Sequence, residues 1–123
     1  MIRLWIGVAG LGGLLSLSAA AYAAHFAAGE PATEALLRTA AEYGLIHAAS
    51  LLALAAIVQK RERPSLLFAL AGWGFSAGIP LFSGSLILLA IGGPESLALL
   101  TPFGGAALLL GWAALLFAAW GRF

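Results

Sequence analysis

The sequence has 123 residues and a formal net charge of +1, and 63% of its residues are hydrophobic whereas 9% are charged. With a mean hydropathy of +1.04, the chain has too few polar residues to cover a soluble domain, so its composition indicates a membrane protein. It contains no cysteine, which excludes disulfides, thiolate chemistry and cysteine-bound metals. The lack of a basic stripe excludes nucleic acid as a partner.

The first apolar run covers residues 4–26 and is long enough to cross the ~30 Å hydrocarbon core as a helix. Arg3 and the small residues 19–23 together also resemble a signal peptide with a cleavage site. The apolar run continues past that site to Phe26, so we expect an uncleaved transmembrane helix.

The second apolar run, residues 43–58, is slightly short for a span, but the segment before it has helical character. Pro31 opens this segment, and Glu34, Arg38 and Glu42 form two successive i,i+4 pairs of opposite charge. The pattern predicts a short interfacial helix over residues 32–42, on the outer side of the membrane, that leads into the second span.

The third and fourth runs, residues 66–91 and 102–120, are separated by a short turn. Gly92 is suited to a left-handed cap and Pro94 blocks continuation, so the third helix is predicted to end there. Thr101 followed by Pro102 predicts an N-cap with proline at the first helical position. Short loops make successive helices antiparallel neighbours. The sequence therefore predicts an all-α polytopic membrane protein, a single domain over residues 1–123 folded as an up-down-up-down four-helix bundle.

Positively charged residues predict the orientation of this bundle. In the four-span arrangement, one side holds five of the six, namely Arg3, Lys60, Arg61, Arg63 and Arg122. The other side holds only Arg38. Because cytoplasmic loops are enriched in lysine and arginine, we expect both termini to be cytoplasmic.

Small residues on the helices predict how the bundle packs, because helices in lipid associate through close backbone approach. Pro80 has no N–H group, so we expect a bend in the third span near residues 76–80. The predicted packing residues are Gly74, Gly78, Pro80, Gly84, Gly104, Gly105 and Gly111. The GxxxG pattern does not identify the partner helix, so contact with a second copy or a larger membrane complex is an alternative to internal packing.

Polar residues within the spans mark a candidate site, since they are costly in hydrocarbon. Most of them share helical stripes that fall in the outer half of the predicted bundle, which predicts a polar pocket that opens outward. The candidates are Tyr22, His25, Glu42, Tyr43, His47, Ser83 and Thr101. Because the first two spans form an antiparallel hairpin, we expect the His25 and His47 imidazoles to lie within about 10 Å, near enough to share a ligand.

Several chemistries fit the two histidines. Structural hydrogen bonding is the first. The others are a zinc or copper site made by His25 and His47 with Glu42, bis-histidine haem ligation, and a proton relay. Our expectation is that no cofactor is bound. Catalysis by Ser83 or Ser85 is not expected, because no aspartate is present to orient a base and no nucleophile-elbow pattern surrounds them.

Several local motifs carry a resemblance to a known family. Three are the segments 82–86 (Phe-Ser-Gly-Ser-Leu), 101–105 (Thr-Pro-Phe-Gly-Gly) and 109–112 (Leu-Leu-Gly-Trp). With His25 after a small-residue helix and the 42–48 region, they resemble the YgdD-like family of small membrane proteins (domain of unknown function 423, also called the transmembrane protein 256 family). The resemblance covers nearly the whole chain and implies a four-helix bacterial inner-membrane protein of unknown function. It departs from the family at residues 20–24, where glycines are usual, and at Glu42, where arginine is frequent.

These observations together predict a non-enzymatic integral protein of the lipid bilayer. Its expected role is that of an accessory or binding component with an outward-facing polar pocket. The alternative is binding or transport of a small molecule, proton or metal through a His25/His47 site, by an oligomer.

Overall fold

The computed structural model describes residues 1–121, so Arg122 and Phe123 lie outside the described part of the chain. That part is helical and contains no strand. Its elements, in chain order, are α1 (Ile2–His25), α2 (Pro31–Val58), α3 (Leu66–Gly78), the π-helical segment η1 (Ile79–Gly84), α4 (Ser85–Ala90), the 3-10 helix η2 (Glu95–Leu99) and α5 (Leu100–Ala119).

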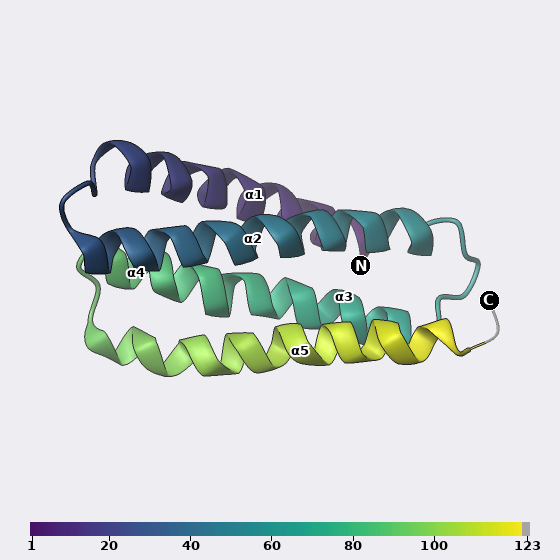
Figure 1. Cartoon of the computed structure of the whole chain (residues 1–123). Coiled ribbons are helices and arrows are strands. Elements are labelled where there is room, and N and C mark those ends of the chain that lie inside the picture. The colour runs from purple at the N-terminus through teal and green to yellow at the C-terminus, as the bar shows by residue number, and fades with distance from the viewer. Residues whose placement is uncertain (122–123) are drawn as a thin grey trace.

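Four helical stretches are long and apolar enough to cross a membrane: α1, α2, the continuous stretch Leu66–Ala90 and the stretch Glu95–Ala119. They lie side by side and alternate in direction, with α1 on one side of α2 and α5 on the far side of the third stretch (Figure 1). The start of α1 and the end of α5 lie at the same end of the bundle. The predicted all-α four-helix membrane bundle is confirmed.

The second span differs from its prediction in one respect. The expected interfacial helix and the span are one uninterrupted helix of 28 residues, α2. Glu34 and Arg38 form the predicted i,i+4 ion pair, with Arg38 Nη2 and Glu34 Oε1 2.8 Å apart. No residue between Arg38 and Val58 breaks the helical hydrogen bonding, so the expected interfacial segment and the transmembrane segment form one continuous helix.

The third span changes its helical geometry where Pro80 was expected to disturb it. Residues Ile79–Gly84 form a π-helical segment between α3 and α4. Because proline lacks an N–H group, the i→i+4 bond from Pro80 to the Ser76 carbonyl cannot form, and the wider helical turn accommodates this loss.

The turn between the third and fourth spans confirms one prediction and corrects another. Gly92 has a φ of 93°, a left-handed conformation that glycine adopts without strain, so its predicted role as a helix cap is confirmed. Thr101 is not an N-cap, because α5 already begins at Leu100 after the 3-10 helix η2. The Thr101 side chain is instead turned toward the third span.

Glycines bring the third span and α5 into close contact. A Cβ added to Gly74 would lie 2.8 Å from the Ala107 carbonyl oxygen, and one on Gly78 would lie 3.2 Å from the Gly104 carbonyl oxygen. One on Gly111 would lie 2.7 Å from the Phe75 ring. We call this contact the closed seam. It leaves no room for larger side chains at these positions.

Small residues also determine the register of α1 against α2. Ser16 lies against Gly44, where any added side chain would collide with the Ser16 hydroxyl. One turn away, a Cβ added to Gly12 would lie 3.8 Å from that of Ala48. The two helices therefore run antiparallel with Ser16 level with Gly44 and Gly12 level with Ala48.

Candidate functional site

His47 is the polar residue at the centre of the bundle, and only 4% of its surface is exposed. Its Nδ1 lies 2.6 Å from the Tyr43 carbonyl oxygen, one turn earlier in α2. Its Nε2 lies 3.0 Å from the indole Nε1 of Trp112 on α5. A carbonyl only accepts and an indole N–H only donates, so His47 carries its proton on Nδ1 and accepts at Nε2. Both ring nitrogens are therefore occupied by hydrogen bonds.

Aromatic rings surround the imidazole. Tyr43 stacks on it with ring centroids 6.2 Å apart, and Phe75 and Trp112 approach it at 5.6 and 6.0 Å. Phe75 and Trp112 also pack edge to face on each other, and Tyr43 packs in the same way on Phe82. These contacts fix the ring of His47 from three helical spans.

A cavity of about 390 Å³ opens beside this cluster, between α2 and α5. Its wall contains rings, leucines and a glycine, and its outer residues Tyr43, Leu109 and Trp112 are 45%, 72% and 44% exposed. The lining residues are Tyr43, Ile46, His47, Phe82, Gly105, Leu108, Leu109 and Trp112. We call this cavity the His47 groove. It opens sideways from the bundle, between two helices that are long and apolar enough to cross a membrane.

The structure does not bring His25 to this site. By the α1/α2 register, His47 is level with Gly13, whereas His25 is the last residue of α1, about twelve residues or 18 Å farther along the axis. His25 is exposed there and lines neither the His47 groove nor the cavity beside Ser83. The expectation that the two imidazoles meet is therefore wrong.

The other predicted pocket residues are distributed over three places. Tyr22 is 47% exposed and packs on Phe26, with ring centroids 5.3 Å apart, and Glu42 is exposed on α2. Thr101 joins the fourth span to the third through its Oγ1, which lies 2.7 Å from Ser85 Oγ. Of the seven predicted residues, the structure brings Tyr43 and His47 together in the His47 groove.

Ser83 lines a different cavity. Its Oγ is buried and has no hydrogen-bond partner among residues 1–121. The cavity, about 170 Å³ in volume, lies between α1 and the π-helical segment, and Gly12, Ser16, Pro80 and Gly84 also line it. Gly84 thus borders a space here, as Gly105 does in the His47 groove, whereas both were predicted to be packing residues.

Comparison with known proteins identifies the family. Residues 19–105 match the family model described as "Protein of unknown function (DUF423)". The chain belongs to this family. It is 31% identical over 120 residues to the UPF0382 membrane protein YwdK of Bacillus subtilis, covering 96% of this chain and 97% of that protein. It is 37% identical over 83 residues to the UPF0382 inner membrane protein YgdD of Escherichia coli K12, covering 68% of this chain and 62% of YgdD. No solved structure matches the chain.

The DUF423 match includes most of the His47 groove. Tyr43, His47, Phe82 and Gly105 lie within residues 19–105, whereas Trp112 lies beyond them. The relatives are named membrane proteins, and those names include no activity or ligand. The family therefore establishes an integral membrane protein and leaves its molecular role to be inferred from the site.

Metal chemistry receives no support from this geometry. Within residues 1–121 there is no group of three or more histidine, aspartate or glutamate side chains that could hold a metal ion. At His47 the Nε2 lone pair accepts the Trp112 N–H, so it is not available to a metal as the protein stands.

Trp112 is the residue of the site that sequence reasoning missed. Its position in the motif 109–112 was noted, but as part of a family pattern and not as a donor. Trp112 is far from both ends of α5, where tryptophans of interfacial belts lie. An indole N–H at that depth needs an acceptor, and this requirement was the signal for a partner such as His47.

Proposed function

We propose that this protein is a non-enzymatic binding component of the bacterial inner membrane, formed by a single four-helix domain. Its His47 groove takes the apolar part of a lipid-soluble molecule that enters sideways from the bilayer. The observation that carries this proposal is the half-open cavity of about 390 Å³, lined by aromatic and aliphatic side chains with one buried polar residue. Its volume and lining are typical of small-molecule sites.

The hydrogen bonds of the polar residues support a binding role over a chemical one. His47 is held by Tyr43 and Trp112, so it serves as a fixed part of the wall. Ser85 Oγ is bonded to the Phe82 carbonyl oxygen and to Thr101. No serine hydroxyl is hydrogen-bonded to a histidine within residues 1–121, and that pairing is what nucleophilic catalysis by serine requires.

Photolabelling tests the proposal. The probe is a phosphatidylcholine with a diazirine in the middle of one acyl chain, added to the purified protein in nanodiscs and mapped by peptide mass spectrometry. We expect labels concentrated around Tyr43, His47 and Trp112. Gly105→Leu fills the groove without a backbone clash, since an added Cβ lies 3.7 Å from the Phe82 ring, and we expect it to abolish these labels.

Ala77→Leu is the control. Ala77 is exposed on α3 and does not line the His47 groove, so a leucine there should leave the labels in place. Labels spread evenly over the lipid-facing side chains of α1 and α5, and unchanged by Gly105→Leu, would refute a specific groove.

The orientation of the bundle is a second part of the proposal: both termini face the cytoplasm. The N-terminal residues lie beside the loop that follows α2, where Met1, Arg3, Gln59, Arg61 and Pro64 line one cavity. Four of the five basic residues of the predicted cytoplasmic side therefore lie at one end of the bundle: Arg3, Lys60, Arg61 and Arg63. The fifth, Arg122, lies outside the described residues. Reporter fusions after residue 123 and within residues 32–37 should report opposite sides, and a periplasmic C-terminus would reverse the assignment.

A ridge on α1 favours association with a partner helix. Gly7, Gly10 and Gly13 leave open space, with nothing within 4 Å of an added Cβ. Glycines that face lipid permit close approach of another helix, so we propose a second copy or a larger complex at this face. Because the chain has no cysteine, Gly7→Cys allows disulfide trapping in native membranes, and Leu15→Cys, exposed on another side of α1, is the control. A cross-link with the control alone would contradict the proposal.

A further inference from the structure

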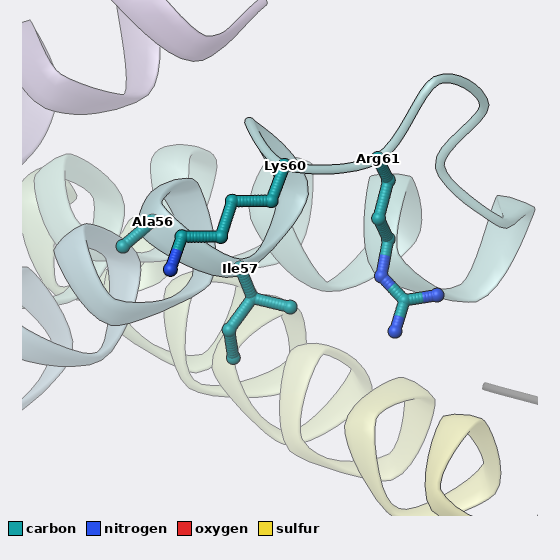
Figure 2. Close-up of a pocket in the computed structure, with 4 residues that line it drawn as sticks. All are labelled: Ala56, Ile57, Lys60 and Arg61. Carbon is teal, nitrogen blue, oxygen red and sulfur yellow. The ribbon is translucent and has the colours of Figure 1, made fainter.

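Another cavity, about 580 Å³ in volume, lies at the end of α2 and combines apolar walls with positive charge. Ala56 and Ile57 form its apolar part, and Lys60 and Arg61 form its charged part (Figure 2). The Lys60 side chain turns back along α2 toward Ala56, and Arg61 extends on the other side of Ile57. Two cations therefore flank an apolar side chain that faces the lipid.

This cavity continues into the His47 groove through shared side chains. Ile57 also lines a narrower depression between α2 and α5, together with Leu54, Trp112 and Leu115. Trp112 in turn lines the His47 groove. These adjoining cavities form a continuous track along α2 from Lys60 and Arg61 to His47. The track exists because α2 and α5 pack on different sides of the third span and make few direct contacts.

The length of the track matches a lipid chain. From Val58, the last residue of α2, to His47 it follows eleven residues, which is about 17 Å along the axis. One leaflet contributes about half of the ~30 Å hydrocarbon core, or about 15 Å. An acyl chain that starts at the level of Lys60 therefore fits within the track and ends near His47.

The charge at the start of the track favours a negative head group. Lys60 makes no ion pair among residues 1–121, and its ammonium lies over apolar side chains where a long cation usually turns outward to water. The Arg61 guanidinium lies 4.7 Å from the centre of the Phe68 ring, which holds it in place. Arg3 and Arg63 add charge at this end, and Glu62 is the acidic residue in its loop.

We propose that the occupant of this track is an anionic phospholipid of the adjacent leaflet. Its phosphate is bound by Lys60 and Arg61, and one acyl chain runs past Ile57 and Trp112 to the His47 groove. This inference rests on the proposed function, because it names the ligand class of the same groove. An ammonium and a guanidinium each donate charge-assisted hydrogen bonds to phosphate oxygens, and an anionic head group leaves more net charge for them to neutralise than a zwitterionic one does.

Native mass spectrometry of the detergent-purified full chain provides the test, with dissociation constants measured for two probes. These are phosphatidylglycerol and phosphatidylcholine with identical acyl chains. We expect phosphatidylglycerol to bind more tightly. Lys60→Gln should weaken phosphatidylglycerol binding about fivefold, because one basic residue near the head groups has an effect of that size, and should weaken phosphatidylcholine binding less.

Arg63→Gln is the matched control. It removes the same charge from the same loop, but Arg63 does not line the cavity, so the phosphatidylglycerol affinity should fall clearly less than in Lys60→Gln. Equal losses in the two variants would show attraction to the whole basic end and overturn the site.

Gly105→Leu separates this inference from the proposed function, since it should weaken both lipids by filling the far end of the track. Equal affinity of the parent for the two lipids, both weakened by Gly105→Leu, would overturn the head-group inference and leave the groove in place. Absence of saturable binding of either lipid would overturn both.

Discussion

Helix α5 contacts the rest of the bundle in two contrasting ways. Toward α3 it presents Gly104 and Gly111, and the backbones meet so closely that an added methyl group on Gly74 would touch a carbonyl oxygen. Toward α2 it presents Leu109, Trp112 and Leu115, and a groove remains between the two helices. Within residues 1–121, the side-chain hydrogen bond that crosses this groove is the one from Trp112 to His47.

On α5, the side that faces α3 therefore contributes to stability, and the side that faces α2 is the one proposed to bind a ligand. Lipid does not drive helices together as water does, so close van der Waals contact and hydrogen bonds hold the bundle. The closed seam supplies that contact. The side of α5 that faces α2, which we call the open side, has bulky side chains that leave a groove. One hydrogen bond, from Trp112 to His47, joins the two helices there.

The largest expected effect comes from adding a side chain in the closed seam, where there is no room for one. Gly74→Leu should destabilise the protein by about 3 kcal/mol, because the side chain would collide with the Ala107 carbonyl and Gly111 backbone. Unfolding in sodium dodecyl sulfate, followed by circular dichroism, measures this change. Gly105→Leu on the open side is the control and should retain near-parental stability. Equal stability of the two variants would mean that the contrast between the two sides is wrong.

A smaller effect is expected from removing the bridge across the open side. Trp112→Phe keeps the ring but leaves His47 Nε2 without a donor, which should lower the free energy of unfolding by about 1 kcal/mol. The nitrogen chemical shift of Nε2, measured by NMR, should also change. Trp120→Phe is the matched control, since Trp120 is 78% exposed near the end of the bundle. An unchanged Nε2 shift in Trp112→Phe would contradict the hydrogen bond.

The smallest expected effect concerns the hydroxyl pair between the third span and α5. Ser85→Ala should lower the free energy of unfolding by about 0.6 kcal/mol, the average for hydrogen bonds between membrane helices. Ser18→Ala is the control, because Ser18 donates to the Leu14 carbonyl in its own helix and joins no neighbour. A greater loss in the control than in Ser85→Ala would show that the pair adds nothing to the seam.

The spans and their ends could be predicted because local chemistry determines them. Runs of apolar residues predict transmembrane helices, and Gly92 with Pro94 predicts a stop that the structure confirms. Pro80 marked the disturbed segment of the third span, since its missing N–H is a property of the residue alone. None of these inferences required knowledge of which helix lies next to which.

The site could not be predicted to the same extent, because it depends on register. His25 and His47 lie on stripes of adjacent helices, but their relative height follows from Ser16 meeting Gly44, a contact that neither stripe encodes. Thr101 looked like a helix cap, but the 3-10 helix before it shifts the start of α5 and turns the hydroxyl to Ser85. The partner of His47 lies 65 residues away, beyond the reach of any local pattern.

The length of α2 has a consequence for the membranes that suit this protein. A helix of 28 residues is about 42 Å long, about 12 Å more than the average hydrocarbon core. The charged residues Glu34, Arg38 and Glu42 lie in its first half, so the excess length extends into the head-group region. Because Lys60 and Arg61 follow the end of this helix, bilayer thickness determines how deep these cations lie relative to the head groups. The groove therefore lies at a different depth in thinner and thicker bilayers. Its occupancy by lipid is expected to vary with lipid chain length.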